Sequence, residues 1–271
     1  MDTRLQKRVQ RYGWDKAATH YERSWKAQLD PAQTALLDIA ELAPGQRVLD
    51  VACGTGLVTL RAASLVAPGG EVAGTDISEE MVAIARETTR ALEIDNVVFE
   101  RMDAEELAFG DDTFTTVLCA LGLMYLPDPE RAITEMHRVL LPGGRAACVV
   151  WGERAKCGWS EIFPIVDAGV RSEVCPLFFR LGTGEVLRHA FQVAGFGAIT
   201  VRRLETWLHY DNAEEACGAA FIGGPVALAC SRFSEQTMAE AQAEYLASLA
   251  PYRQGEGYDM PGEFVVVAGI K

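Results

Sequence analysis

The sequence predicts an α/β fold: a doubly wound, mostly parallel sheet of seven strands with helices on both faces and helical insertions as a cap. Strand-like and helix-like segments alternate from about residue 32 to residue 151, which is the pattern of parallel strands joined by crossover helices. The strand-like segments are continuous apolar runs, as expected for strands that are covered on both faces. We expect right-handed connections between them.

The first part of the chain contains five predicted strands. The run "RVLDVA" ends in a glycine turn, and the helical pattern that follows stops at "PGG". Residues 78–94 begin with a serine and carry acids in the first turn, which are signals of a helix N-terminus. A second "PGG" is expected to end the helix of residues 129–140. The predicted strands are 47–52, 71–77, 97–103, 114–123 and 145–151, and the predicted helices are 57–67, 78–94 and 129–140.

The later part predicts two more strands, which would close the sheet as an antiparallel pair. These are a long run at 198–210 and a last run at 262–270, preceded by a helix with a glycine stop at 184–196. Helical patterns at 212–221 and 235–252 form an insertion between the two strands. The expected organisation is a helical cap at 1–34, a cofactor-binding core at 35–151, a lid at 152–182, the last helix and sixth strand at 183–210, a helical cap insertion at 211–261 and a closing strand at 262–271.

Charge and cysteine content exclude several classes of partner. The formal net charge is -13, from 38 acidic and 25 basic residues, which disfavours nucleic acid and anionic membranes as partners. The basic stretch "TRLQKRVQR" is interpreted as a solvated helix face, or as a contact for an anionic partner. Seven cysteines without CxxC spacing argue against a zinc site and a disulfide framework. With no secretory start and no run long enough to cross a membrane, we expect a cytoplasmic protein without a metal.

The stretch "RVLDVACGTG" is the strongest candidate for a binding site, because loops after parallel strands hold ligands. Gly54 and Gly56 allow backbone to approach a ligand closely. The dinucleotide fingerprint would need a third glycine where Thr59 stands, and no lysine follows for a phosphate-binding loop. Asp76 lies 20 positions past Gly56, where a carboxylate could accept both hydroxyls of a ribose.

Five motifs in order resemble a known family. "VLDVACGTG", "GTDIS", "RMDAEELAF", "FTTVLCALGL" and "EMHRVLLPGGR" are similar in order and spacing to the class I S-adenosylmethionine-dependent methyltransferases. The sequence looks most like the branch that contains the ubiquinone and menaquinone biosynthesis C-methyltransferases. The resemblance covers about residues 35–151, and the strand pair at 198–210 and 262–271 fits the closing hairpin of this Rossmann-like fold. It implies S-adenosyl-L-methionine as the cofactor.

The resemblance also implies roles for individual residues. Asp50 would hold the turn near the methionine amino group, and Asp76 would bind the ribose. Asp103 would accept the adenine amino hydrogen while the N–H of Ala104 meets a ring nitrogen. A tyrosine like Tyr21 folds over the cofactor in this family. The residues expected to contact the other parts of the cofactor are Ala52, Gly54, Gly56, Cys119 and Ala120 at the methionine portion and Ile77 and Met81 at the adenine. In isolation, Asp50 and Asp103 could equally be turn and helix caps.

Methyl transfer from a sulfonium is an in-line displacement, so positioning dominates and a general base is optional for an ionised phenol or enolate. His20 and His209 are the candidate bases, because they lie in segments outside the shared domain that could reach the pocket. His137 and His189 lie in predicted helices and are expected to be structural or superficial.

The remaining segments predict an apolar chamber, and therefore a small, mostly apolar acceptor that is phenolic or quinol-like. The N-terminal segment carries Tyr12, Trp14, Tyr21 and Trp25, and the lid and insertion carry Trp159, Phe163, Phe178, Phe179 and Phe221; all could equally be ordinary core residues. Three alternatives stay open: an NAD(P)-dependent oxidoreductase, a non-catalytic cofactor-binding regulator, and an arsenite methyltransferase that would use Cys157, Cys175 and Cys217.

Overall fold

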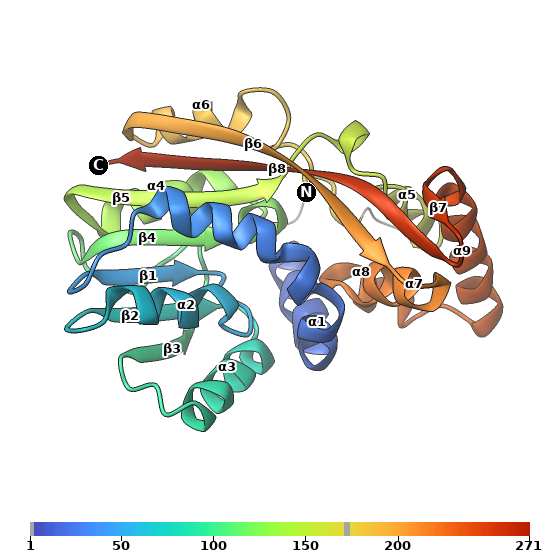
Figure 1. The fold of residues 1–271 in the computed structure, drawn as a ribbon, viewed down its shortest axis with the longest axis horizontal. Coiled ribbons are helices and arrows are strands. Elements are labelled where there is room, and N and C mark those ends of the chain that lie inside the picture. Colours follow the sequence, from blue (N-terminus) through green and yellow to red (C-terminus); the bar gives the residue numbers. More distant parts are fainter. Residues whose placement is uncertain (1–2, 171–173) are drawn as a thin grey trace.

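One mixed sheet forms the centre of the structure, a computed structural model that describes residues 3–170 and 174–271 (Figure 1). The strands are β1 (Arg47–Val51), β2 (Glu71–Asp76), β3 (Val97–Arg101), β4 (Phe114–Ala120), β5 (Leu140–Trp151), β6 (Gly197–Tyr210), β7 (Arg253–Gln254) and β8 (Gly257–Ile270). They run in the order β3-β2-β1-β4-β5-β8-β6, and the two-residue β7 pairs with β8. β8 is antiparallel to β5 and β6, whereas the other neighbours in this order are parallel. The predicted seven-stranded sheet is confirmed, with β7 as a small addition.

Helices cover both faces of this sheet. In Figure 1, α2 and the C-terminal half of α1 lie in front of the strands and α4 lies behind them. Side-chain caps start several helices: Ser78 accepts from the N–H of Met81, and Asp128 accepts from the N–H of Arg131. The helices are α1 (Thr3–Ala40), α2 (Leu57–Val66), α3 (Glu79–Ala91), α4 (Pro129–Val139), α5 (Ile162–Asp167), α6 (Val186–Val193), α7 (Ala213–Ile222), α8 (Gly224–Cys230) and α9 (Glu235–Ser248), with short 3-10 turns at Leu123–Tyr125, Arg154–Lys156 and Ala250–Tyr252.

Two strands, β5 and β8, begin about five residues earlier than predicted. α4 ends at Val139, one residue before its predicted end, but β5 begins at Leu140 rather than at residue 145, so the second "PGG" lies inside the strand. Leu140 pairs with Phe114, and regular pairing resumes between Thr116 and Arg145, so the motif forms an irregularity in the strand. The closing strand is also longer than predicted, because β8 begins at Gly257. α1 is one helix across residue 34, and the division of the chain into segments stays a prediction.

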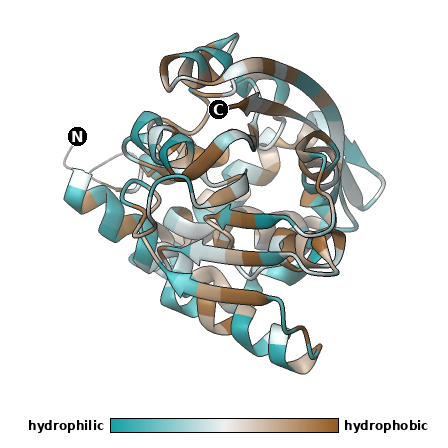
Figure 2. Cartoon of the chain, turned by 90° about the vertical axis from the view of Figure 1, so that its left-hand side faces the viewer, coloured by the Kyte–Doolittle hydropathy of each residue, from teal (hydrophilic) through white to brown (hydrophobic). Residues whose placement is uncertain are grey.

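The hydrophobic core lies along the central strands. Val48, Leu49, Val117 and Leu118 are fully buried between the two helix layers, as continuous apolar strands predict. Figure 2 shows hydrophobic residues along the sheet and hydrophilic residues on the outer turns of the helices. Within residues 3–170 and 174–271, no helix has the length and apolarity needed to cross a membrane. Since β1, β2 and β4 are parallel, the loops after them meet at one edge of the sheet, and α1 passes over this edge.

Candidate active site

A cavity of about 640 Å³ opens at this edge of the sheet. Eight of the predicted cofactor residues line it: Tyr21, Ala52, Gly54, Asp76, Ile77, Met81, Asp103 and Ala120. The other lining residues are Lys7, Gln10, Trp14, Glu105, Leu121, Gly122, Tyr125, Leu126 and Pro127. We call this space the cofactor cavity.

Asp76 occupies the end of β2 with both carboxylate oxygens already oriented. Oδ2 accepts the N–H of Gly54 at 2.9 Å, and Oδ1 accepts the N–H of Ser78 at 2.9 Å. Burial raises the pKa of Asp76 to about 6, although these two hydrogen bonds oppose the shift. Each oxygen keeps a further lone pair, so the carboxylate can still accept two hydroxyl groups.

Asp50 lies behind the glycine turn and does not line the cavity. Its side chain is fully buried, and the hydroxyl of Thr59 donates to Oδ2 at 2.6 Å. Oδ1 has no hydrogen-bond partner among the described residues. Burial raises the pKa of Asp50 to about 7. A buried carboxylate oxygen without a donor favours a cationic or hydrogen-donating ligand group nearby, which suits the ammonium of a methionine moiety.

The glycine turn itself is formed by backbone with positive φ. Gly54 has φ of +56°, and a Cβ there would lie 3.9 Å from Cε1 of Tyr21, so the tyrosine ring of α1 lies over the turn. Ala52 also has a positive φ, of 55°, a conformation that few non-glycine residues adopt. Gly56 differs from the prediction, because a Cβ there would meet Phe99 at 3.0 Å behind the turn rather than the cavity. Its role is to allow the close packing of the turn on Phe99.

The loop after β3 places two acids in the cavity under the N-terminal part of α1. Asp103 accepts the N–H of Glu105 at 2.9 Å through Oδ1, and Lys7 donates to its Oδ2 at 2.7 Å. Lys7 also pairs with Glu105 at 2.6 Å. Ala104 is buried with its side chain in the core and does not line the cavity, and the contact of its backbone N–H with an adenine ring nitrogen stays a prediction.

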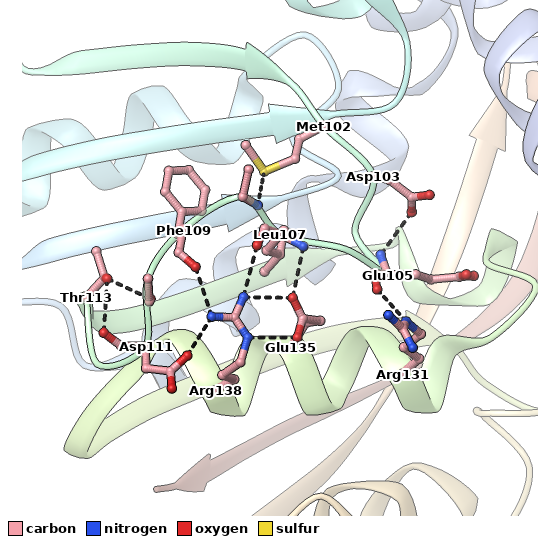
Figure 3. Close-up of polar contacts among 12 residues, drawn as sticks. Met102, Asp103, Glu105, Leu107, Phe109, Asp111, Thr113, Arg131, Glu135 and Arg138 are labelled. Atoms are coloured by element: carbon pink, nitrogen blue, oxygen red, sulfur yellow. Dashed lines mark hydrogen bonds and ion pairs between the residues drawn. The ribbon is translucent and has the colours of Figure 1, made fainter.

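This loop is fixed to α4 by charged side chains of the "EMHR" segment (Figure 3). Arg138 donates to the carbonyl oxygens of Leu107 and Phe109, each at 2.9 Å, and also pairs with Glu135. Glu135 in turn accepts the N–H of Leu107 at 2.9 Å. Because Arg138 and the N–H of Leu107 bind this carboxylate, the pKa of Glu135 is lowered. The motif therefore holds the loop that carries Asp103.

A second cavity, of about 590 Å³, adjoins the first. The two share the wall formed by Trp14, Tyr21, Leu121 and Tyr125. The rest of its lining is Trp25, Leu29, Met124, Trp151, Trp159, Ile162, Phe163, Cys175, Phe178, Ala220, Gly223, Pro225 and Val226. None of these described residues is ionised, so the space suits a neutral or weakly charged apolar ligand. We call it the aromatic cavity.

Comparison of the sequence with known proteins shows the family to which the chain belongs. Residues 42–154 match the family described as methyltransferase domain. A demethylmenaquinone methyltransferase of Staphylococcus aureus is 34% identical over 172 residues, which are 58% of this chain and 70% of the relative. The chain belongs to the class I S-adenosylmethionine-dependent methyltransferases.

The similarity to this methyltransferase family is concentrated in the core. A demethylmenaquinone methyltransferase of Bacillus cytotoxicus is 38% identical over 125 residues, which are 46% of this chain and 53% of the relative. The chain thus spans about half the length of several curated relatives that it matches. The structure of YcgJ from Bacillus subtilis has a TM-score of 0.65 at 18% identity and covers 89% of this chain and 98% of its own, which shows a shared fold.

Four predicted contacts do not line the cofactor cavity: Asp50, Gly56, Ala104 and Cys119. Asp50 and Gly56 lie behind the turn, as described above. Cys119 is fully buried in β4, opposite the free Cys148 in the register of β5, so its side chain belongs to the core. Its neighbour Ala120 does line the cavity.

The two candidate bases do not reach either cavity. His20 is exposed on α1, and His209 is exposed at the end of β6. Nδ1 of His209 lies 2.6 Å from Asp259 and Nε2 lies 3.2 Å from Asp211, and these hydrogen bonds raise the pKa of the ring. Because both rings are on the surface, away from the residues that line the cavities, we assign neither a catalytic role.

Three of the five aromatic residues that were predicted to form an apolar chamber line the aromatic cavity. Trp159, Phe163 and Phe178 line the aromatic cavity. Phe179 and Phe221 do not line it; Phe179 packs on Phe178 at 4.8 Å between ring centroids, and Phe221 packs on Tyr245 at 5.7 Å. Of the three cysteines considered for arsenite chemistry, only Cys175 lines the aromatic cavity.

Several lining residues were not predicted. Lys7 lies in the basic stretch near the N-terminus, whose second interpretation was contact with an anionic partner. Gly122 and Tyr125 directly follow β4, where two signals were present in the "LCALGLMY" segment: a glycine and an aromatic residue after an apolar strand. A Cβ on Gly122 would lie 2.5 Å from Cβ of Ala52, so the two loops can meet only through a glycine.

Proposed function

We propose that this protein transfers a methyl group from S-adenosyl-L-methionine to a small, mostly apolar acceptor of phenolic or quinol-like character. The observation that carries the proposal is the wall shared by two unlike cavities: one lined by carboxylates and glycines, the other by aromatic rings. The name demethylmenaquinone methyltransferase, carried by the relatives above, supports an acceptor of quinone type.

The residues of the cofactor cavity fit the three parts of this cofactor. Asp76 would accept the ribose hydroxyls, and Ile77 and Met81 would pack on the adenine, whose amino group Asp103 would bind. The buried Oδ1 of Asp50, which lacks a donor among the described residues, would lie near the ammonium group behind the turn. When bound, the cofactor supplies an electrophilic methyl group on a sulfonium. Ala52, Gly54 and Ala120 would border the methionine portion, with Tyr21 closing over it.

The chain's contribution to the reaction would be positioning and exclusion of water. Positioning can supply on the order of 7 to 11 kcal/mol in such a displacement. Burial raises the pKa values of Tyr21 and Tyr125 at the shared wall, so both phenols stay protonated and do not act as bases at neutral pH. An acceptor that ionises by itself needs no base from the protein.

The alternatives are less well supported. Thr59, at the third position of the dinucleotide fingerprint, is fully buried and donates to Asp50, so this turn is not the glycine turn of a dinucleotide site. The family membership also disfavours an oxidoreductase. A non-catalytic regulator would bind the cofactor but turn over no acceptor. The net charge of -13 supports a small molecule, rather than nucleic acid, as partner, and a cytoplasmic location remains part of this proposal.

The test is a calorimetric titration of the purified protein with S-adenosylhomocysteine, run in parallel with NADH. We expect saturable binding of S-adenosylhomocysteine and none of NADH, followed by acceptor-dependent methyl transfer in a screen of phenols and quinols with labelled cofactor. Preferential binding of NADH would contradict the proposal. Cofactor binding without transfer to any member of the screen would favour the regulator.

A further inference from the structure

The wall between the two cavities contains two tyrosines whose hydroxyl groups have no role in the arrangement described above. Tyr21 comes from α1 and Tyr125 from the 3-10 turn Leu123–Tyr125 after β4, and both line both cavities. Trp14 packs edge-on against each ring, with centroid distances of 5.9 Å to Tyr21 and 5.0 Å to Tyr125. Phe178 also packs edge-on against Tyr125, with a centroid distance of 5.2 Å. The rings are therefore fixed by packing from three elements.

The hydroxyl groups remain available to a ligand. Within residues 3–170 and 174–271, neither hydroxyl group has a hydrogen-bond partner. Burial, followed by the charge of Asp76, raises the pKa of Tyr21, and burial raises that of Tyr125. Each group therefore keeps its proton and can donate it in a hydrogen bond. Because both residues line the cavities, a ligand oxygen there can accept these hydrogens.

The rest of the aromatic cavity cannot hold an anion, because no ionised side chain lines it among the described residues. The indole N–H of Trp159, elsewhere in this cavity, is a buried donor without a partner among the described residues, whereas the two tyrosine hydroxyl groups are donors at the shared wall, next to the expected position of the methyl group. We infer that Tyr125, together with Tyr21, binds the oxygen of a phenol, enol or quinol acceptor; this inference rests on the proposed function. The two hydroxyl groups would thereby select rings that carry oxygen over hydrocarbons.

Two probes that differ in one group test this inference: 1-naphthol and 1-methylnaphthalene, titrated with and without S-adenosylhomocysteine. Four tryptophans line the cavity, so their fluorescence reports binding directly. The wild-type protein should prefer 1-naphthol. Tyr125→Phe keeps the ring and removes the hydroxyl, so it should weaken 1-naphthol binding about 3- to 10-fold, the range expected for one hydrogen bond. Affinities for 1-methylnaphthalene and S-adenosylhomocysteine should not change.

A second readout separates hydrogen bonding from packing. Two donors favour the ionised form of bound 1-naphthol, so its absorbance-detected pKa in the complex should be higher in Tyr125→Phe than in the wild-type protein. Tyr21→Phe should shift it in the same direction. Tyr245→Phe removes a buried hydroxyl whose ring lines neither cavity, and it serves as the control for general destabilisation.

Several outcomes would overturn the inference. An equal loss for both probes would make Tyr125 a packing residue, and a loss confined to S-adenosylhomocysteine would assign its hydroxyl to the cofactor. No preference for 1-naphthol in the wild-type protein would also overturn it. Since the probes bind without methyl transfer, a failure of the proposed function appears separately, as absent binding of S-adenosylhomocysteine.

Discussion

The cofactor cavity and the aromatic cavity share a wall but are held in shape by different forces. In the cofactor cavity, directional bonds fix single groups: Asp76 accepts two backbone N–H groups, and Lys7 bridges Asp103 and Glu105. In the aromatic cavity, rings pack on rings, as between Phe163 and Phe178 at 4.7 Å. Directional bonds demand particular residue types at particular positions, whereas apolar packing accepts many combinations.

This difference explains why the sequence predicts the cofactor cavity in more detail than the aromatic cavity. The loops after β1, β2, β3 and β4 that line the cofactor cavity form what we call the polar frame. Their residues belong to motifs that occur in order along the chain, and the family match covers residues 42–154, which contain most of them. The aromatic cavity draws its lining from α1 and from residues 121–125, 151–163, 175–178 and 220–226, which are far apart in the sequence. The sequence therefore predicts the identity of the cofactor more precisely than that of the acceptor.

The largest effect should come from removing the carboxylate that anchors the polar frame. We expect Asp76→Ala to weaken S-adenosylhomocysteine binding by roughly 2 to 4 kcal/mol, the loss of about two charge-assisted hydrogen bonds. Calorimetry measures this directly, with Asp76→Asn as a variant that preserves shape. Binding of 1-methylnaphthalene in the aromatic cavity should be unaffected.

Asp38→Ala is the matched control, because that carboxylate is exposed on α1. If the Asp76 variants fold and bind S-adenosylhomocysteine as the wild-type protein does, the ribose is not where we place it. Loss of 1-methylnaphthalene binding as well would show that the two cavities are not independent.

Arg138→Ala should have the next largest effect, through the loop that carries Asp103. It leaves the carbonyl oxygens of Leu107 and Phe109 without their donor, at a cost in unfolding free energy of about 2 to 3 kcal/mol. S-adenosylhomocysteine affinity should fall with it. Denaturant unfolding and calorimetry measure the two quantities. Lys26→Ala, which breaks an exposed ion pair with Glu22, should cost less than about 1 kcal/mol; equal losses in the two variants would remove the special role of Arg138.

The sequence predicted the sheet and much of the cofactor cavity because their signals are local. Asp76, Asp103 and Ala120 follow strands whose apolar runs are unmistakable, and the topology of parallel strands brings them together. Lys7 reaches Asp103 across 96 positions by the path of α1, and no local pattern encodes that contact. The early start of β5 was missed because the pairing of Leu140 with Phe114, and not the "PGG" motif, decides where the strand begins.

A smaller effect should follow from filling the space between two loops of the frame. Gly122→Ala places a methyl group against Ala52, where overpacking costs about 1 to 3 kcal/mol. Gly218→Ala is the matched control, since a Cβ there meets nothing within 4 Å, and in helix α7 it should be neutral or stabilising by about 0.5 to 1 kcal/mol. Unfolding free energies measure both. An unchanged stability in Gly122→Ala would mean that the Ala52 turn yields easily.

The smallest effect should be a pH dependence confined to the cofactor cavity. The pKa of Asp50 is raised to about 7, so the free protein binds a proton there that the unfolded chain releases near pH 4. This carboxyl's contribution to stability therefore falls as pH rises from about 4 to 7. A ligand ammonium group near Asp50 favours the ionised form, so binding releases the proton, and affinity rises with pH until about 7.

Between pH 6 and pH 8 we expect S-adenosylhomocysteine to bind about tenfold more tightly at the higher pH, with protonation of Asp76, whose pKa is about 6, adding to the loss at lower pH. Calorimetry in buffers of different ionisation enthalpy counts the released proton. Asp50→Asn should flatten the profile between pH 6.5 and 8, whereas binding of 1-methylnaphthalene, which touches no ionised group, should not vary with pH. A flat profile in the wild-type protein would mean that the ammonium group does not sense Asp50, and the polar frame would then specify the ribose but not the methionine end of the cofactor.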